Sequence, residues 1–259
     1  SRRRLTVVMK TDEHQLMITK GAVEEMAAIC KYVEIDGEIL ELTPEIRQQL
    51  QTVNEKMNRQ GMRVITVAVR RDAHDEAIYS TDDEKDMTLV GFMGFLDPAK
   101  ASAKPAIKSL QQHGVAVKVL TGDNAIVAQK VCQDVGIPAD QYVLANQIDE
   151  MSDDELYQAA ETTNLFAKLN PMQKSRIIEA LQNKGHTVGF MGDGINDAPA
   201  LRKADVGISV DTAADITKDA SSIILLEISL GVLENGVIEG RRVFSNMMKY
   251  IKITISSNF

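Results

Sequence analysis

Alternating hydrophobic and polar residues predict β-strands in the first third of the chain. Segments 5–10 (LTVVMK) and 14–20 (HQLMITK) flank a polar stretch as the arms of a hairpin do, and 32–40 (YVEIDGEIL) contains an Asp36-Gly37 turn. Segment 62–70 (MRVITVAVR) alternates in the same way. Because tight turns join neighbouring strands directly, the pattern predicts an antiparallel sheet.

Two segments between these strands have the longer repeat of a helix. Residues 21–30 (GAVEEMAAIC) form the first. The second covers 43–61, where Thr43 is a suitable N-cap and Gly61 ends the helix. Strands and helices together predict an α+β domain with an antiparallel sheet over residues 1–95.

The pattern changes after Asp97-Pro98, where apolar strands alternate with helices. The strands are predicted at 115–123, 164–169, 186–194, 205–210 and 222–227, and the helices at 124–136, 170–185, 196–204 and 213–220. Strands separated by helices of about a dozen residues are typical of a parallel sheet covered on both faces. We therefore expect an α/β domain over residues 96–229.

Residues 230–259 contain no strand pattern and predict one long helix, amphipathic at first and more apolar towards its end. An ordinary packing helix accounts for this segment. A cytoplasmic stalk that enters a membrane accounts for it equally well, because basic residues precede an apolar turn. These residues are Arg241, Arg242, Lys249 and Lys252. No uninterrupted apolar run approaches the roughly 20 residues of a membrane-spanning helix.

Two of the predicted parallel strands end in Gly-Asp, at Gly122-Asp123 and Gly192-Asp193. The carboxyl ends of such strands line one crevice, so Asp123, Asp193 and Asp197 are expected to share a pocket. Two charges about 4 Å apart repel by roughly 4 kcal/mol at an effective dielectric of 20, so this cluster needs a cation. Mg²⁺ is the natural one, because it binds one or two carboxylates and bridges to phosphate oxygens.

Three further residues complete a candidate phosphoryl-transfer site. Lys174 supplies a positive charge, Thr121 a hydroxyl, and Asn196 an amide that donates or binds the metal. Each feature has an ordinary alternative: a solvated lysine, a helix cap at Thr121, or a plain turn around the glycines. The order of LTGDN, NPMQK and MGDGINDAPAL at successive strand ends favours the site. The chain contains neither a dinucleotide fingerprint nor a P-loop sequence.

Composition and net charge limit the kinds of binding partner and the compartment that suit this chain. The net charge of -8 and the lack of Lys/Arg clusters exclude nucleic acid as the main partner. Cys30 and Cys132 lack the spacing of a zinc site or a disulfide framework, which indicates a reducing compartment.

The strings KGAVEEM, TGDN, MGDGINDAPAL and ADVGIS resemble the cytoplasmic part of P-type ATPases, which belong to the haloacid dehalogenase (HAD) superfamily. The resemblance covers essentially the whole chain. It implies a partial nucleotide-binding domain at 1–95, a phosphorylation domain with a Rossmann-like, HAD-type parallel sheet at 96–229, and a stalk helix at 230–259 that leads to a transmembrane segment. It also implies ATP as substrate, Mg²⁺ as cofactor, and a cytoplasmic position within an integral protein of the cell inner or plasma membrane.

The resemblance gives roles to individual residues. The nucleotide-binding residues are Lys20, Gly21, Arg63, Thr121, Gly122, Asp123 and Lys168, with Arg2 as a further phosphate contact. The catalytic residues are Lys174, Thr121 and Asp197, of which Lys174 pairs with an aspartyl phosphate. The Mg²⁺ ligands are Asp193, Asn196 and Asp197.

The chain departs from the family in what it lacks. The phosphate acceptor, an aspartate in DKTGT, does not occur in these 259 residues, and neither does the TGE loop of the actuator domain. We therefore expect a fragment without the first strand of the phosphorylation domain, which binds nucleotide weakly and takes no covalent phosphate alone. Its parent would work with an actuator domain and move a cation through membrane helices.

The surroundings of FMGDGIND and the tail are most similar to bacterial Mg²⁺-importing P-type ATPases, so Mg²⁺ is the expected transported ion. Three alternatives stay open: a Ca²⁺-type or other cation pump, a soluble HAD phosphatase, and a noncatalytic nucleotide-binding module. The KGAVEEM segment and the basic-then-apolar tail favour the pump.

Overall fold

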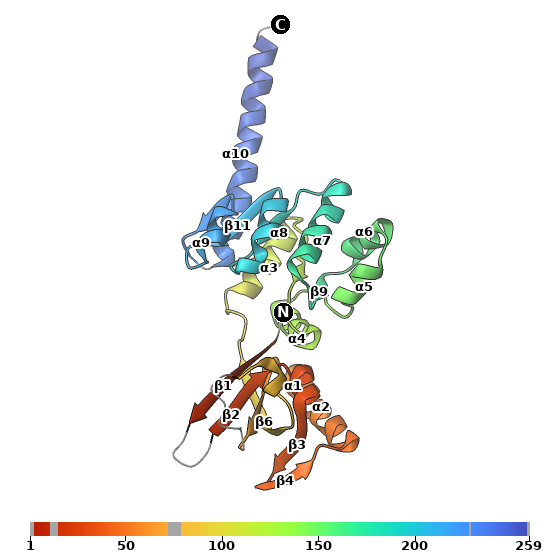
Figure 1. Ribbon diagram of the computed structural model, residues 1–259. Helices are drawn as coiled ribbons and strands as arrows, with labels where there is room; N and C mark the ends of the chain where they lie inside the picture. Colours follow the sequence, from red (N-terminus) through yellow and green to blue (C-terminus); the bar gives the residue numbers. More distant parts are fainter. Residues whose placement is uncertain (1–2, 11–14, 72–78, 228, 258–259) are drawn as a thin grey trace. The chain divides into compact units, whose positions relative to one another are not determined.

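The chain folds into two compact units, residues 1–97 and 98–259. The computed structural model describes residues 3–10, 15–71, 79–227 and 229–257 (Figure 1). Arg2, expected as a phosphate contact, lies outside these residues.

The first unit contains a six-stranded sheet with the strand order β1-β2-β5-β6-β3-β4. Its strands are β1 Arg4–Lys10, β2 Gln15–Gly21, β3 Cys30–Ile35, β4 Glu38–Glu41, β5 Met62–Arg70 and β6 Met87–Leu96. Most neighbours pair antiparallel, as predicted, but β3 and β6 run parallel, so the sheet is mixed. The reason is that α1 (Val23–Ile29) follows β2 and carries the chain to the far side of β6.

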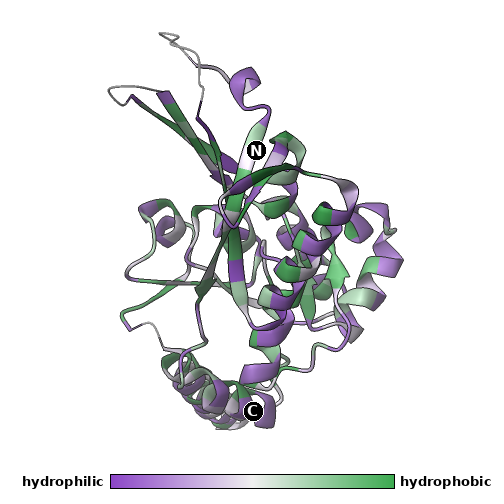
Figure 2. Ribbon diagram, turned by 90° about the horizontal axis from the view of Figure 1, so that it is seen from below, coloured by the Kyte–Doolittle hydropathy of each residue, from purple (hydrophilic) through white to green (hydrophobic). Residues whose placement is uncertain are grey.

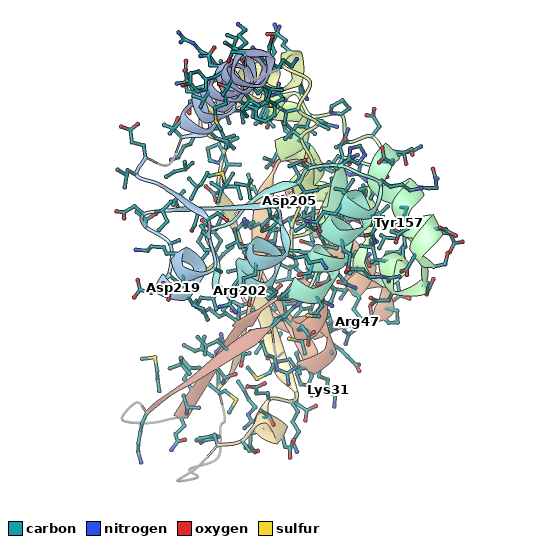
Figure 3. All side chains as sticks on the ribbon, turned by 90° about the horizontal axis from the view of Figure 1, so that it is seen from above. Lys31, Arg47, Tyr157, Arg202, Asp205 and Asp219 are labelled. Carbon is teal, nitrogen blue, oxygen red and sulfur yellow. The ribbon has the colours of Figure 1, made fainter. Side chains whose placement is uncertain are left out.

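Two helices, α1 and α2 (Pro44–Arg59), cover one face of this sheet. Met26 of α1 packs there with Met17 and Ala68 of the strands. Thr43 caps α2 as predicted, because its hydroxyl accepts the Ile46 N–H at 3.4 Å. The guanidinium of Arg47, labelled in Figure 3, donates to the carbonyls of Ala27 and Cys30 and ties α2 to the end of α1.

The opposite face of the sheet, here called the outer face, follows from the alternation along the strands. Met17, Thr19 and Ala68 are fully buried on the helix side, so their neighbours in sequence point the other way. The outer face consists of Leu5, Val7, Met9, Leu16, Ile18, Lys20, Arg63, Ile65, Val67, Val69, Gly91, Met93 and Phe95. Many of its large apolar side chains are about half exposed, which is unusual for a folded domain.

The second unit contains two separate three-stranded parallel sheets. One has the order β7-β9-β8 and the other β10-β11-β12. The strands are β7 Val119–Leu120, β8 Val143–Leu144, β9 Leu165–Ala167, β10 Gly189–Met191, β11 Val206–Val210 and β12 Ile223–Leu225. Parallel strands at the predicted places confirm an α/β unit, although the paired segments are shorter than the predicted apolar runs.

Helices and single helical turns connect these strands. They are α3 Ala103–Gln112, α4 Ala125–Val135, α5 Ala145–Glu150, α6 Asp153–Thr162, α7 Pro171–Asn183, the 3-10 turn η2 Ile195–Asp197, α8 Ala198–Lys203, α9 Asp215–Asp219 and α10 Leu230–Ser257. In the first unit, η1 (Thr81–Asp83) precedes β6. The elements β6, α3, β8, α5 and α6 were not predicted. Ser152 and Glu155 form a capping box at the start of α6, a signal that the sequence does contain.

Among its described residues, the long helix α10 is anchored between Leu230 and Arg241. Leu230 packs against the cluster beneath α3 and α4, and Leu233 packs against the cluster of the β10-β11-β12 sheet. Arg241 donates to the carbonyl of His113, the residue that ends α3. Beyond this point all described residues are exposed, and Figure 2 shows hydrophobic and hydrophilic residues mixed along the helix. Within the described part of the chain, no helix combines the length and apolar character needed to cross a membrane.

Candidate functional site

Lys20 and Arg63 lie on the outer face of the first unit. Lys20, near the end of β2, is exposed and stands opposite Val67 of β5. Arg63 is exposed near the start of β5 and stands opposite Phe95 of β6. Arg63 lies four positions before Val67, which is about 13 Å along the strand. The sheet therefore presents two positive side chains across an apolar surface.

Only a glycine fits at position 21, because Arg3 and Arg4 lie close to its backbone. A Cβ atom at this position would lie 2.8 Å from the Arg3 carbonyl oxygen and 2.7 Å from the Arg4 Cβ atom. The close approach is fixed by the Ala22 N–H, which donates to the same carbonyl at 3.1 Å. The chain itself thus occupies the space that Gly21 leaves, and a ligand contact at Gly21 stays a prediction.

In the second unit, the loops after β7 and β9 are joined by backbone hydrogen bonds. The Lys168 N–H donates to the Asp123 carbonyl and the Leu169 N–H to the Thr121 carbonyl, each at 3.0 Å. The Thr121 hydroxyl accepts the Asp123 N–H at 3.0 Å, so Thr121 shapes its own loop. Asn124, and not Thr121, caps α4 through the Ile126 N–H at 2.9 Å.

Lys168 has an unusual backbone within this pair of loops. Its φ of 59° lies in the left-handed region, which is disfavoured for residues other than glycine. The two hydrogen bonds to the Thr121–Asp123 loop hold the backbone on either side of it. Gly122 completes the contact, since a Cβ atom there would lie 3.4 Å from the Leu169 carbonyl oxygen. Thr121, Gly122, Asp123 and Lys168 therefore lie together.

Helix α7 begins directly after this loop and is strongly capped. Asn170 accepts the Gln173 N–H at 2.9 Å, and the Gln173 side-chain oxygen accepts the Asn170 N–H at 2.9 Å. The amide nitrogen of Gln173 also donates to the Ala145 carbonyl at 2.9 Å and to Asp149 at 2.7 Å. Gln173 is only 5% exposed, so this polar side chain is buried with its bonds made.

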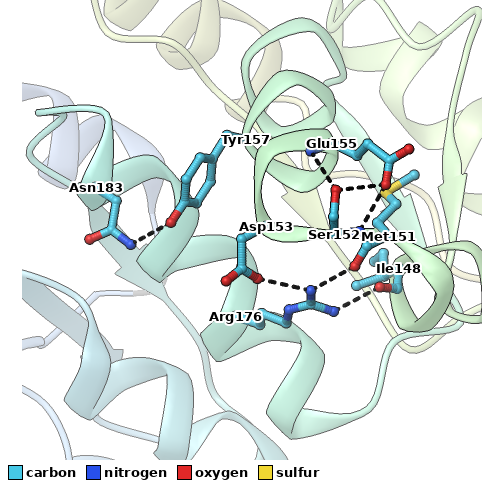
Figure 4. Close-up of polar contacts among 8 residues, drawn as sticks. All are labelled: Ile148, Met151, Ser152, Asp153, Glu155, Tyr157, Arg176 and Asn183. Carbon is cyan, nitrogen blue, oxygen red and sulfur yellow. Dashed lines mark hydrogen bonds and ion pairs between the residues drawn. The ribbon is translucent and has the colours of Figure 1, made fainter.

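Arg176 extends the same anchorage one turn further (Figure 4). Its guanidinium donates to the carbonyls of Ile148 and Met151, each at 2.8 Å, and to Asp153 at 3.1 Å. These acceptors belong to the end of α5, the following loop and the start of α6. The first turns of α7 are therefore fixed to the α5–α6 segment.

Lys174, between these two anchors, reaches the loop after β10. Its Nζ atom lies 2.7 Å from Asp197 Oδ1, and the two side chains are 12% and 13% exposed. Asp197 Oδ2 accepts the Gly194 N–H at 3.2 Å. Gly192 allows this arrangement, because a Cβ atom there would come within 2.7 Å of the Asp197 Cβ atom. A chain of contacts thus links the loops after β7, β9 and β10.

The expected cluster of three carboxylates is not what the structure shows. Asp193 and Asn196 are exposed on the same loop as Asp197, while Asp123 belongs to the loop after β7. Among the described residues, no three His, Cys, Asp or Glu side chains form a group able to hold a metal ion. The sequence reasoning also missed Gln173 and Arg176. The spacing of Asn170 and Gln173, typical of a capping box, could have identified the first of them.

The comparisons with known proteins agree in one family. Residues 1–102 match the family described as "P-type ATPase, cytoplasmic domain N". The chain is 51% identical over 259 residues to "Magnesium-transporting ATPase, P-type 1" of Escherichia coli (strain K12), and covers 29% of that relative. It is 51% identical over 260 residues to the protein of the same name in Salmonella typhimurium (strain LT2), again covering 29%. A calcium-transporting ATPase of Listeria monocytogenes is 34% identical over 261 residues, of which the chain covers 30%.

In each comparison with a whole relative, essentially all of this chain aligns, yet it spans less than a third of the relative's length. The chain belongs to the P-type ATPases.

Proposed function

We propose that the chain is the nucleotide-binding and phosphorylation part of an ATP-driven cation transporter. The relatives in its family are named as transporting ATPases. The observation that carries the proposal is the contact of 2.7 Å between Lys174, in the first turn of α7 after β9, and Asp197, in the segment after β10. Loops at the carboxyl ends of parallel strands are where α/β proteins bind their ligands.

The proposed roles differ between the two units. We propose that residues 1–95 form part of the nucleotide-binding domain, 96–229 the core of the phosphorylation domain, and 230–259 a stalk leading towards membrane helices. In each small parallel sheet, one edge strand is followed by a loop that contains a Gly-Asp pair. This strand is β7 in one sheet and β10 in the other. This supports a single HAD-type sheet in the parent protein, completed by a strand that brings the acceptor aspartate from outside this chain.

The chemistry proposed for the second unit is phosphoryl transfer. The Lys174 ammonium is oriented by Asp197 and would neutralise charge on the phosphoryl group, while the Thr121 hydroxyl would donate to it. Thr121, Gly122, Asp123 and Lys168 are proposed contacts of phosphate and ribose groups. The parent enzyme would hydrolyse ATP through an aspartyl phosphate, a step that this chain does not complete alone.

Asp193, Asn196 and Asp197 would hold Mg²⁺. Their oxygen donors suit this ion, which binds by one or two carboxylates and keeps several waters, so a group of three carboxylates is not required. Asp193 and Asn196 are exposed and accessible to an ion, and Asp197 keeps its place through Lys174 and Gly194. When bound, Mg²⁺ would neutralise charge on the phosphate oxygens.

The relatives also support Mg²⁺ as the ion that the parent protein transports. The named magnesium-transporting relatives are 51% identical to the chain, and the calcium-transporting relative is 34% identical. We propose a parent protein in the bacterial inner or plasma membrane, with this part on the cytoplasmic side. The cation would pass through membrane helices, and an actuator domain would act on the phosphorylated intermediate; both belong to the parent protein.

A calorimetric titration with MgATP tests the nucleotide site. Lys20→Gln and Arg63→Gln are each expected to weaken binding about tenfold, the value of one charged hydrogen bond. Lys56→Gln is the matched control, because Lys56 is exposed on α2, which covers the other face of the sheet. Absence of ATP binding by the wild-type chain at millimolar concentrations would overturn the proposal.

Titration with Mg²⁺, followed by NMR, tests the metal site separately. Asp193→Asn is expected to remove the Mg²⁺-induced shifts of the Gly192–Asp197 loop, whereas Asp211→Asn, an exposed aspartate after β11, should retain them. Unchanged shifts in Asp193→Asn would exclude Asp193 as a ligand.

A further inference from the structure

We infer that Gly91 forms the seat of the nucleotide base on the outer face of the sheet, and that its missing side chain determines whether a base fits there. The inference rests on the proposed binding of ATP by the first unit. It adds a residue that the sequence analysis did not select.

The position of Gly91 follows from the pairing of the strands. Lys20 of β2 stands opposite Val67 of β5, and Val67 stands opposite Gly91 of β6. All three lie on the outer face, so the Lys20 side chain and the Gly91 backbone lie in one row across the sheet. Two strand spacings separate them, about 10 Å, a distance that an extended lysine side chain largely spans.

The surface above Gly91 is open. A Cβ atom built at Gly91 would meet no atom within 4 Å. Past Leu89, β6 is paired with β5 alone among the described strands, so no neighbouring strand closes the space from the other side. The next outer-face residue along β6 is Met93, which is 52% exposed. At Gly91 the outer face therefore consists of backbone alone, and the Met93 side chain stands beside it. This place is called the step.

Packing does not account for this glycine. Gly94, three residues further along the same strand, faces the helices, and a Cβ atom there would lie 2.6 Å from the Met57 Cε atom of α2. Gly94 thus faces the flexible ends of Met57 and Met62, which belong to its own unit. Gly91 has no such neighbour and no positive φ, although a glycine inside a strand weakens it. The register of β6 shifts beside Gly91, since Val67 pairs with Gly91 and Ala68 with Leu89. This bulge does not itself require a glycine, because the φ of Gly91 is not positive. The remaining role of a glycine inside a strand is the close approach of another molecule to the backbone.

Charge and shape point to a nucleotide as that molecule. The flat base of a nucleotide suits an apolar floor, and Ile65, Val67 and Met93 surround the step. Arg63 lies beyond them, four residues from Val67 along β5, where it suits the phosphate chain. The base would lie over Gly91 beside Lys20, with the phosphates directed along β5 towards Arg63.

Substitution at Gly91 separates this role from stability. Gly91→Val fills the step with a branched side chain that strands favour, so the free energy of unfolding should stay equal or rise. ATP affinity should fall at least tenfold. Gly94→Ala is the control on the opposite face: its Cβ atom meets only the flexible ends of Met57 and Met62, so the ATP affinity of the folded protein should be retained.

Inorganic tripolyphosphate serves as a probe without a base. Gly91→Val should bind tripolyphosphate as the wild type does, and Arg63→Gln should lose affinity for both ligands. Gly91→Ala provides a graded variant and should show a smaller loss of ATP affinity than Gly91→Val. Wild-type ATP affinity in Gly91→Val, or an equal loss for ATP and tripolyphosphate, would refute the seat. A wild-type chain that binds tripolyphosphate and ATP equally would refute it as well, whereas one that binds neither would overturn the proposed function itself.

Discussion

Lys174 on α7 and Asp197, the last residue of η2, form an ion pair with 2.7 Å between Nζ and Oδ1, although they are 23 positions apart. Both side chains are nearly buried, and the second carboxylate oxygen is held by the Gly194 N–H. The pair therefore joins the loops that follow β9 and β10, which belong to different sheets. The Lys174 ammonium is in this way held in a fixed position, where a phosphoryl group could contact it.

Breaking this ion pair should be costly. Asp197→Asn leaves the Lys174 ammonium nearly buried without its anionic partner, and we expect about 3 kcal/mol less stability in urea unfolding. Glu179→Gln is the matched control, because Glu179 and Lys203 also join α7 to α8 but are 53% and 38% exposed. Its effect should stay below about 1 kcal/mol. Equal effects of the two substitutions would contradict the special position of Lys174.

Gln173 should control the order of the first turn of α7. Gln173→Leu removes the acceptor for the Asn170 N–H and the donors to Ala145 and Asp149, and should destabilise the protein by about 2 kcal/mol. Gln173→Glu keeps the acceptor but loses the donors.

The measurement is hydrogen exchange. Amides in the first turn of α7 should exchange faster in Gln173→Leu, and less so in Gln173→Glu because its cap remains. Amides of α5 should be affected in both variants, since both lose the bonds to Ala145 and Asp149. Unchanged exchange in Gln173→Leu would show that the cap does not order the helix.

The two cysteines should be unreactive in the folded chain. Burial raises the pKa of the Cys30 thiol to about 12, with Arg47 acting weakly against it, and burial raises that of Cys132 to about 11. At pH 8, iodoacetamide should modify them only as fast as the protein unfolds, because the thiolate is the reactive form. Rapid modification without urea would contradict this.

The same shifts predict a pH dependence of stability. In the unfolded chain both thiols lose their protons near the ordinary pKa of 9.0, before the folded chain does. Their contribution to stability is therefore complete below about pH 9 and declines as the pH rises towards 11 to 12. The free energy of unfolding should fall less steeply over this range in Cys30→Ala/Cys132→Ala than in the wild type.

Two glycines should respond oppositely to alanine. Gly236, within α10, has no atom within 4 Å of a built Cβ atom, so Gly236→Ala should stabilise the helix by about 1 kcal/mol and increase the circular dichroism at 222 nm. Gly207→Ala should destabilise the protein by about 1 to 3 kcal/mol, because its Cβ atom would lie 2.5 Å from the Leu201 carbonyl oxygen. A loss of helicity in Gly236→Ala would contradict a continuous, unobstructed helix at this position.

Apart from β6, which was not predicted, the sequence predicted the strands and helices of the first unit well, because its strands alternate and its turns are explicit. Asp36 and Gly37 have positive φ values of 52° and 86° in the turn between β3 and β4. The parallel pairing of β3 with β6 has no local signal, since it depends on where α1 carries the chain. Long-range pairing of this kind is decided by the packing of the whole sheet.

In the second unit the order of strands and helices was predictable, but the extent of the strands was not. The apolar run at 115–123 contributes only Val119 and Leu120 to a ladder, because pairing also requires a neighbour in register. The meeting of Lys174 and Asp197 follows from the rule that the carboxyl ends of parallel strands converge. The same rule does not set distances, so a cluster of three carboxylates around Asp123 was too specific an expectation.

Helix α10 is attached to the second unit over its first turns and extends well beyond them. Its first turn rests on two hydrophobic clusters through Leu230 and Leu233, and Arg241 binds the end of α3. From Arg241 to Ser257 the helix continues for about 24 Å without a buried residue. A tilt of about 5° at Arg241 would displace Ser257 by about 2 Å, so any rotation of the anchored turns would be larger at the end of the helix.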